Sequence, residues 1–239
     1  MEAAPLYAGK AKSLYPTDDP DQLLMVYRDD ATAGNGAKHA RLAGKGELNA
    51  AISAVAFGWL EAEGIPTHFL GRVDPVTHRV QALRMLPVEV VVRNRLAGSL
   101  ASRLGQPEGM ALPEPVVEFY YKDDALGDPM VLGEHLVALG KMDLDQVGRV
   151  RASALAVNRI LAARLGRAGL ELVDFKLEYG LSRGGELLVG DEISPDTARL
   201  WDRATGERLD KDRFRRDLGE LVPAYREVLD RLERDHATL

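Results

Sequence analysis

Alternating charged residues make one short segment a candidate for chemistry that needs a cation. In VDFKLEYG, the residues Asp174, Lys176 and Glu178 alternate with apolar residues. Side chains alternate between the two faces of a strand, so these three charges share one face. The glycine pair at 184–185 predicts a turn, and the returning strand would bring Asp191 beside Glu178. Two adjacent carboxylates suit a hard cation such as Mg²⁺, so the pair is a candidate metal site.

A valine-rich segment with arginines predicts an anion site. In MLPVEVVVRNRLAGS, Glu89, Arg93 and Arg95 fall on one face of a strand that is otherwise largely apolar. Ser99 follows at the expected N-cap of a short helix, where free backbone N–H groups favour a phosphate. The arginine fork matches phosphate or carboxylate oxygens, so Arg93 with Ser99 is a candidate anion clamp.

Two lysines near the N-terminus are candidates for binding a triphosphate. Lys10 and Lys12 share one face of an expected strand from Tyr7 to Tyr15, beside Gly9. Because glycine permits close backbone approach, a hairpin here could cover phosphates, as glycine-rich loops do in kinases. As exposed strand residues, the two lysines would contribute little to stability.

Each of these motifs has an ordinary structural explanation when it is taken alone. Alternating charges occur on solvated strands, an isolated arginine near a helix cap is commonly a surface residue, and paired lysines protect strand edges from aggregation. The polar loop DDATAGNGAK could contact a ligand or simply lie at the surface. The five histidines have no paired metal-ligand spacing, and the sequence has neither a P-loop nor a nucleophile elbow. The motifs therefore carry weight only in combination.

The composition narrows the chemistry further. The chain has 239 residues, no cysteine and a formal net charge of -6. Without cysteine there is no disulfide, thiolate metal site or thioester, so an acyl group would have to be activated by ATP. The negative charge gives no general attraction to nucleic acid. The first ten residues lack a signal-peptide pattern and no apolar stretch is long enough to span a membrane, so we expect a cytoplasmic protein.

The elements that must position these residues follow no regular alternation. Periodicity predicts, in chain order, a hairpin with strands at 7–15 and 23–27, a helix at 47–63, strands at 67–73, 79–85 and 88–95, a helix from a capping box at 143 to a glycine at 169, two strands around the 184–185 turn, and a long helix from about 212. Runs of strands interrupted by single helices favour an α+β fold over a doubly wound parallel sheet.

We place a soft boundary near residue 85. The part at 1–85 would be a β-rich nucleotide-binding lobe, and the part at 86–239 an α+β lobe with the substrate and metal site and the C-terminal helix. No linker composition marks the boundary, so the lobes are expected to belong to one compact molecule.

Six blocks of the sequence resemble, in order, the phosphoribosylaminoimidazole-succinocarboxamide synthase family, also called SAICAR synthetases. They are Y-x-G-K-x-K-x-x-Y at 7–15, DDATAGNGAK at 29–38, LPVEVVVRNRLAGS at 86–99, YYKDDALGDPM at 120–130, LVDFKLEYG at 172–180 and GDEISPDTARLWD at 190–202. The third and fifth blocks are the most specific. Tyr179 replaces a phenylalanine that is common in the family, and Asn35 stands where aspartate is also usual.

The resemblance implies both a fold and an activity. It implies an ATP-grasp-like pair of α+β lobes with ATP between them. It also implies an enzyme that uses ATP and Mg²⁺ to join L-aspartate to a carboxylated aminoimidazole ribonucleotide. In this family the imidazole carboxylate attacks the γ-phosphate, and the amino group of aspartate captures the acyl phosphate, which leaves ADP and phosphate. Together with the amphipathic C-terminal helix, the resemblance further implies a homodimer.

The resemblance also implies a role for each candidate residue. Lys10, Lys12 and Lys122 would contact ATP phosphates; Glu178 and Asp191 would hold Mg²⁺ beside the nucleotide; Arg93, Ser99 and Arg199 would hold the 5′-phosphate of the ribonucleotide; Glu89 and Lys176 would orient the imidazole; and Asp174 and Asp196 are secondary candidates, for catalysis and substrate binding respectively.

Two other functions stay open at this point. One is a different ATP-dependent phosphotransferase or ligase, and the other is a nonenzymatic nucleotide-binding protein. The clamp of Arg93 and Ser99 bears on the first, since it predicts a substrate that already carries a phosphate monoester. Nucleotide binding without turnover would support the second.

Overall fold

The structure of the protein is a computed structural model that describes residues 4–33 and 37–236. Among these residues the three sheets contain only antiparallel strand pairs, and helices interrupt the strands without regular alternation. The predicted α+β class is therefore confirmed. Asn35, which was compared with the family's aspartate, lies outside the described residues.

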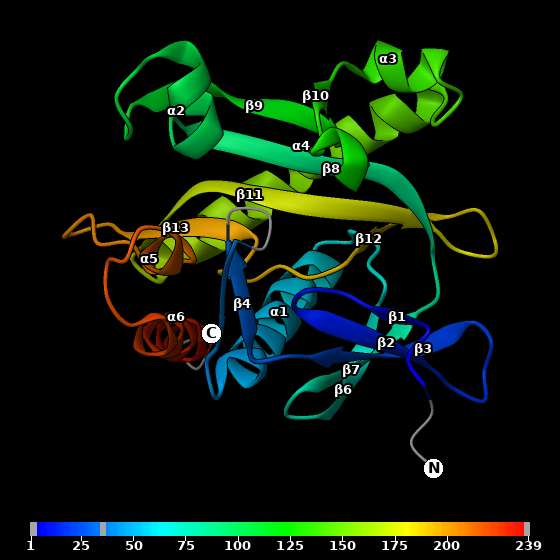
Figure 1. Cartoon of the computed structure of the whole chain (residues 1–239), viewed down its shortest axis with the longest axis horizontal. Coiled ribbons are helices and arrows are strands. Elements are labelled where there is room, and N and C mark those ends of the chain that lie inside the picture. Colours follow the sequence, from blue (N-terminus) through cyan, green and yellow to red (C-terminus); the bar gives the residue numbers. More distant parts are fainter. Residues whose placement is uncertain (1–3, 34–36, 237–239) are drawn as a thin grey trace.

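The N-terminal third of the chain builds a five-stranded sheet, at the lower right of Figure 1. Its strands, in spatial order, are β1 (Tyr7–Ala8), β2 (Lys12–Pro16), β3 (Gln22–Tyr27), β7 (Thr77–Gln81) and β6 (Phe69–Asp74). A separate two-stranded ribbon joins β4 (Asp30–Ala33) to β5 (Lys38–Arg41).

The prediction of one continuous strand at 7–15 is wrong. The chain reverses there, so that Tyr7 pairs with Leu14, and the Gly9 N–H donates to the Lys12 carbonyl at 2.8 Å. A tight hairpin and a single strand both alternate their side chains, so periodicity cannot distinguish them. The reversal leaves Lys10 at the turn, while Lys12 is the first residue of β2.

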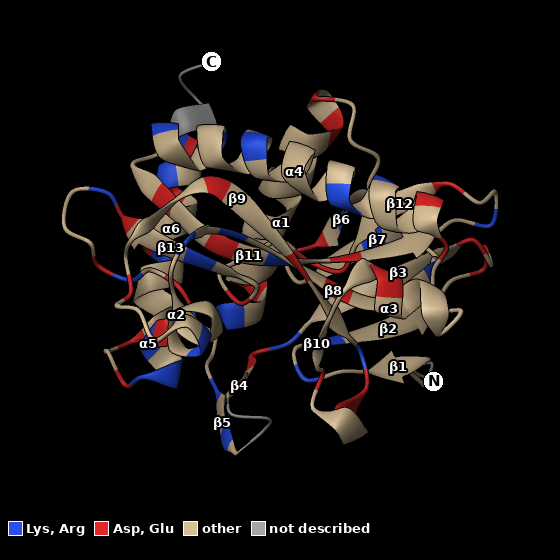
Figure 2. Ribbon diagram, turned by 90° about the horizontal axis from the view of Figure 1, so that it is seen from above, with Lys and Arg blue, Asp and Glu red and all other residues tan. Residues whose placement is uncertain are grey.

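The central and C-terminal parts of the chain build a six-stranded sheet. Its strands are β8 (Arg84–Arg95), β9 (Ala111–Tyr121), β10 (Met130–Val131), β11 (Leu170–Leu181), β12 (Leu187–Gly190) and β13 (Ala198–Asp202), in the order β10-β9-β8-β11-β12 with β13 beside β11. The hairpin of β11 and β12 was predicted from the glycine turn and is confirmed. Figure 2 shows the charged residues along β11.

Strand β8 runs for 12 residues where the sequence predicted an interruption near Pro87. The pairing of β8 with β11 skips residues between Glu178 and Gly180, and Pro87 falls in that irregularity. A proline is tolerated at a bulge because its missing N–H has no ladder partner to lose there. The strand therefore continues past Pro87 to Arg95 and carries Glu89 and Arg93 to the centre of the sheet.

Six α-helices cover the sheets in the described part of the chain. They are α1 (Lys45–Ala62), α2 (Gly98–Leu104), α3 (Gly133–Ala138), α4 (Leu144–Arg167), α5 (Asp212–Arg215) and α6 (Leu221–His236). The predicted capping box begins α4: Gln146 N–H donates to the Asp143 carboxylate at 2.7 Å, and Asp143 N–H donates to Gln146 Oε1 at 3.0 Å. None of the helices described is long and apolar enough to cross a membrane.

The prediction of one long helix from residue 212 is wrong, because the chain breaks between α5 and α6. Asp217 and Gly219 have φ values of 55° and 113°, which a right-handed helix cannot accommodate. Pro223 lies in the first turn of α6, where its missing N–H is harmless. In a continuous helix its ring would clash with the carbonyl of Gly219, so the apolar stripe beyond the break belongs to α6 alone.

The main apolar core runs through both halves of the molecule, and a smaller cluster with Met25 and Val80 lies at the first sheet. Helix α1 contacts both α4 and α6, and α4 packs on β8 and β11. Residues such as Phe57, Val90, Phe175 and Val228 are fully or almost fully buried in this core. Tyr179 is also buried, and its hydroxyl donates to Ser153 Oγ at 3.2 Å, which satisfies the polar atom that a phenylalanine would lack.

We expect His78 to make the free energy of unfolding depend on pH. His78 is fully buried, its Nε2–H donates to the Ala50 carbonyl at 3.0 Å, and burial lowers its pKa from 6.5 to about 4. Below pH 6.5 the unfolded chain therefore binds a proton that the folded protein refuses until about pH 4, so stability falls as the pH is lowered through this range. Replacing His78 by Gln should remove about 1.4 kcal/mol per pH unit from that slope.

Urea unfolding at several pH values measures the effect, with the exposed His135→Gln as the matched control. A slope that His78→Gln leaves unchanged would contradict the prediction, whatever the change in absolute stability.

Candidate active site

Residues of both large sheets line one cavity of about 1260 Å³. Such a volume exceeds that of a typical single-ligand pocket, which is about 300–1,000 Å³, so two ligands can lie side by side. The wall formed by the first sheet is apolar, with Leu14, Leu23, Met25 and Val80. The wall formed by β8 and β11 carries the charged residues. The cavity therefore has one face for an apolar group and one for charged groups.

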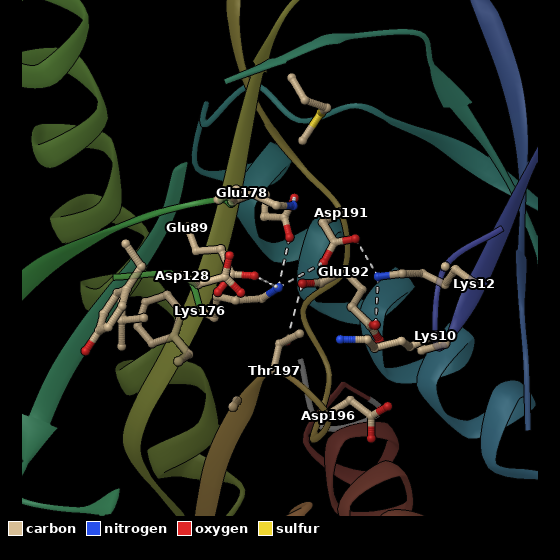
Figure 3. A pocket seen from close by; sticks show the side chains of 18 of the residues that line it. Lys10, Lys12, Glu89, Asp128, Lys176, Glu178, Asp191, Glu192, Asp196 and Thr197 are labelled. Carbon is tan, nitrogen blue, oxygen red and sulfur yellow. Dashed lines mark hydrogen bonds and ion pairs between the residues drawn. The ribbon is translucent and has the colours of Figure 1, made fainter. Parts of the chain in front are cut away.

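A lysine surrounded by carboxylates lies at the centre of the charged wall (Figure 3). Lys176 Nζ donates to Glu89 Oε1 at 2.8 Å and to Glu178 Oε1 at 2.9 Å, and lies 3.9 Å from Asp191 Oδ2. Glu89 on β8 is directly opposite Glu178 on β11, so strand register brings the acids together. Burial alone would lower the pKa of Lys176, but these carboxylates raise it well above its ordinary value. Lys176 is therefore a fixed positive charge.

Lys12 reaches across the cavity from the other sheet. Its Nζ donates to Asp191 Oδ1 at 2.5 Å and to Glu192 Oε1 at 2.7 Å (Figure 3). Burial disfavours the ammonium form, but Asp191 and Glu192 outweigh that penalty and raise its pKa. The lysine side chain is only 14% exposed, so the expectation of an exposed strand lysine is wrong for Lys12. Lys10 is exposed at the turn and lines the same cavity.

The backbone at Asp191 is held in an unusual conformation. Asp191 follows β12 with a φ of 60°, which is uncommon for any residue except glycine. His68 Nε2–H donates to the Asp191 carbonyl at 3.0 Å, and burial lowers the pKa of His68 to about 4, so the ring is neutral. Such strain persists only where neighbouring contacts enforce it. Here those contacts aim the carboxylate between Lys12 and Lys176.

Glu178 and Asp191 have the donor chemistry for a hard divalent cation. Both offer carboxylate oxygens, and Lys122 Nζ also donates to Glu178 Oε2 at 2.6 Å. No cluster of three or more candidate metal ligands occurs among the described residues. Mg²⁺ is commonly held by one or two carboxylates, with phosphate oxygens and water as its other ligands. Glu178 and Asp191 therefore fit a cation that arrives with a phosphorylated ligand. In the structure itself, Lys12, Lys122 and Lys176 neutralise the two carboxylates.

Arg93 lies at the other end of the charged wall, with each guanidinium nitrogen engaged. Nε donates to Glu118 Oε2 at 2.9 Å and Nη1 to Asp174 Oδ2 at 2.6 Å. Nη2 donates to Ser99 Oγ at 2.9 Å and to the Tyr120 hydroxyl at 3.2 Å. The expectation that Ser99 is the helix N-cap is wrong, since α2 already begins at Gly98 after an Ala97 cap. Ser99 instead presents its hydroxyl to Arg93 from the first turn.

Asp174 holds a second arginine beside the first. Arg199 Nη1 donates to Asp174 Oδ2 at 2.8 Å, and its Nε donates to Asp212 Oδ2 at 3.0 Å. Asp174 is 3% exposed and lies in this arginine cluster, away from the lysine and the acids at the centre. Two guanidinium groups held by one carboxylate oxygen form a preorganised site for a dianion.

Asp196 is enclosed by cations and a tyrosine. Its Oδ2 lies 2.6 Å from Nζ of the fully buried Lys45 and 3.7 Å from Lys211 Nζ, and its Oδ1 accepts from the Tyr225 hydroxyl at 2.7 Å. Burial opposes ionisation, but Lys211 and Lys45 hold the pKa of Asp196 down, at about 2. These contacts join the loop after β12 to α1 and α6.

Comparisons with known proteins agree along almost the whole chain. The family model of SAICAR synthetase matches residues 5–232. The chain belongs to the SAICAR synthetase family. A phosphoribosylaminoimidazole-succinocarboxamide synthase from Brevibacillus brevis is 53% identical over 230 residues, which cover 96% of each chain. A solved SAICAR synthetase in complex with ADP is 51% identical, has a TM-score of 0.92, and covers 95% of this chain and 96% of its own. The enzyme from Ehrlichia chaffeensis is 38% identical with a TM-score of 0.94, covering 96% and 98%.

Several charged residues of this SAICAR synthetase family member escaped the sequence analysis. They are Lys45, Arg103, Glu118, Glu192, Lys211 and Asp212; Arg103 is within hydrogen-bond distance of Ser99, and each of the others is within ion-pair distance of a candidate site residue. Arg103 could have been found, since it follows Ser99 by one helical turn and points to the same side. The others meet their partners only through tertiary folding, for which a single sequence offers no local signal.

We expect Asp196 to matter more for folding than its polar surroundings suggest. Replacing Asp196 by Asn leaves Lys45 buried without its counter-charge, which should reduce the free energy of unfolding by about 3–5 kcal/mol. Tyr225→Phe removes only a hydrogen bond to the same carboxylate and should cost about 0.5–1.5 kcal/mol. Urea unfolding of both variants tests the difference. Equal losses would show that Asp196 is not the essential counter-charge of Lys45.

Proposed function

We propose that the protein joins L-aspartate to a carboxylated aminoimidazole ribonucleotide, with cleavage of ATP to ADP and phosphate. The supporting observation is that one cavity holds both a lysine–carboxylate cluster and a separate arginine clamp. The first suits a metal-bound polyphosphate, and the second suits the phosphate monoester of a ribonucleotide. The names of the relatives and the ADP complex of a homologue agree with this assignment.

We propose an ATP-grasp-like arrangement in which ATP lies between lobes at 1–85 and 86–239. The apolar wall with Leu14, Met25 and Val80 suits a flat adenine base, and Lys10 and Lys12 extend from the same sheet towards the acids. All strands of the first sheet precede residue 82, and all strands of the six-stranded sheet follow residue 83. This division supports the two lobes, and the apolar wall supports placing ATP against the first sheet.

The acid–lysine cluster is suited to activating a carboxylate. A carboxylate is a poor acyl donor, since it would have to expel oxide, whereas an acyl phosphate can expel phosphate. Enzymes promote such phosphoryl transfer mainly by positioning and by neutralising charge. In this proposal Lys12 and Lys122 bind the phosphates, and Lys176 with Glu89 orients the imidazole carboxylate. Glu178 and Asp191 would hold Mg²⁺, which neutralises phosphate charge when bound.

The arginine clamp fixes the other end of the same substrate. Arg93, Ser99 and Arg199 bind the 5′-phosphate, while buried Asp174 keeps the two arginines side by side. The carboxylate oxygens of Asp196 are engaged by Lys45 and Tyr225, so Asp196 affects substrate binding indirectly. It does so by positioning Lys211, which lines the cavity. The cytoplasmic location and the homodimer stay predictions.

The proposed route predicts transfer of an oxygen atom. If the carboxylate oxygens of the ribonucleotide carry ¹⁸O, attack on the γ-phosphorus places one label in the phosphate, and the C–O bond breaks when the aspartate amine attacks. Released phosphate should therefore contain one ¹⁸O for each amide formed, measured by mass spectrometry. Chelation of divalent ions should stop amide and ADP formation together.

Omission of each substrate in turn provides the controls for this experiment. Unlabelled phosphate, or AMP among the products, would reject the acyl phosphate. Nucleotide binding with no turnover in the complete mixture would reject the ligase itself and favour a binding protein.

Two substitutions should affect different substrates. Arg93→Lys replaces a fork by a point charge, so KM for the ribonucleotide should rise with little change in KM for ATP. Lys12→Ala removes a charge-assisted contact to ATP, which is worth about 1.5–3 kcal/mol of apparent binding or transition-state stabilisation. The variant should therefore have a higher KM for ATP or a lower kcat. Because Lys12 compensates the buried Glu192 and the half-buried Asp191, its loss should also lower Tm.

Steady-state kinetics with each substrate varied in turn, and thermal melts of both variants, test this pair. The reverse pattern, with Arg93→Lys acting on ATP, would show that the two anion sites are interchanged.

A further inference from the structure

We propose that Glu108, which lies outside the cavity lining, is a positioning residue that sets the affinity of the arginine clamp for a phosphate monoester. The inference rests on the proposed function of that clamp. Glu108 lies between α2 and β9, and it joins the start of α2, which carries Ser99, to the residues around α5. In Figure 1, α2 lies above α5 on the left side of the molecule, and the contact of Arg216 with Glu108 links the residue after α5 to the loop after α2.

The first contact of Glu108 fixes the start of α2. Its Oε1 accepts the Gly98 N–H at 2.9 Å, immediately before Ser99. Gly98 has a φ of 52°, and a Cβ at this position would lie 2.4 Å from Arg199 Nη2. The guanidinium group therefore packs directly on the Gly98 backbone. Holding the Gly98 N–H thus also fixes the surface against which Arg199 rests.

The remaining contacts of Glu108 reach the far side of the clamp. Arg216 donates through Nη1 to Oε2 at 2.9 Å and through Nη2 to Oε1 at 2.5 Å, and Arg208 Nη2 donates to Oε2 at 2.9 Å. Arg216 also pairs at 3.7 Å with Asp212, the residue that holds Arg199 Nε. Glu108 is therefore linked to Arg199 by two routes, one through Gly98 and one through Arg216 and Asp212.

The charge of Glu108 is needed for this geometry. The hydrogen bonds from Arg216 lower its pKa to about 2, so the carboxylate is ionised at neutral pH. A carboxylate cannot itself bind an anion, so any effect of Glu108 on phosphate affinity must pass through its partners. Without this charge, the three contacts that hold the 208–216 segment against the loop between α2 and β9 disappear together. The clamp would then have to be ordered by the ligand, and ordering on binding reduces affinity.

Glu108→Gln tests the proposal, because glutamine can still accept the Gly98 N–H but has lost the charge that holds Arg208 and Arg216. We expect KM for the ribonucleotide to rise roughly tenfold, which corresponds to about 1.4 kcal/mol. KM for ATP and kcat at saturating substrates should change by no more than about twofold to threefold, which corresponds to about 0.4–0.7 kcal/mol. The matched control is Glu114→Gln, an exposed acid on β9.

A binding measurement separates this effect from a general loss of stability. The guanidinium carbon of Arg208, a partner of Glu108, lies 5.3 Å from the centre of the Trp201 ring. The tryptophan fluorescence of the full chain can therefore report the titration of the clamp with ribose 5-phosphate. Glu108→Gln and Arg216→Gln should each weaken binding, and the double variant should be no worse than the poorer single variant, since both break one link.

Four results would count against the proposal. If the losses of ribose 5-phosphate affinity added up in the double variant, Glu108 and Arg216 would not form one link, and the proposal would be overturned. Equal rises in the KM values for ATP and the ribonucleotide, together with a lower Tm, would make Glu108 merely structural and overturn it too. Unchanged ribonucleotide KM in Glu108→Gln would overturn it as well. If the unaltered protein bound ADP but no phosphate monoester, the proposed function of the clamp would fail first, and Glu108 would have nothing to position.

Discussion

The compensation of charges inside the cavity is the constraint on which the rest of the structure depends. An uncompensated charge in a low-dielectric interior costs several kcal/mol, and each buried acid that lines the cavity has a cationic partner. Lys12 of the first sheet pairs with Asp191 and Glu192, which follow the last strand of the β11–β12 hairpin. This pairing across the cavity fixes the separation of the two walls. The turn at Gly9 and the strained backbone of Asp191 both help to bring these groups into contact.

The same compensation lets the site exchange partners with its ligands. Lys12, Lys122 and Lys176 all contact carboxylates, so incoming phosphates and a divalent cation could replace lysine–acid pairs by lysine–phosphate and metal–acid pairs. The number of opposite-charge contacts is then conserved, and little desolvation cost is added on binding. The raised pKa values of Lys12 and Lys176 matter for this exchange, since these two ammonium groups stay charged throughout.

Local physics determined which parts of the structure the sequence could predict. Asp143 with Gln146, the glycine turn before β12, and the shared face of Glu89 and Arg93 depend on residues a few positions apart, and these predictions agreed with the structure. The hairpin within 7–15 and the break before α6 were missed, because an alternating or helical pattern continues across both. Contacts such as Lys45 with Asp196 join residues far apart in the chain, and no periodicity encodes them.

The two ends of the cavity use different cations for a geometric reason. All three protons of a lysine ammonium group radiate from one atom, so Lys176 can serve several acids that converge on a point. Arg93 instead must donate to two structural carboxylates and still turn a nitrogen towards Ser99, which needs three separate nitrogens in one plane. A lysine anchored by Glu118 and Asp174 would have little left to present. The arginine fork combines anchoring and binding in one side chain, so the clamp can be rigid before its ligand arrives.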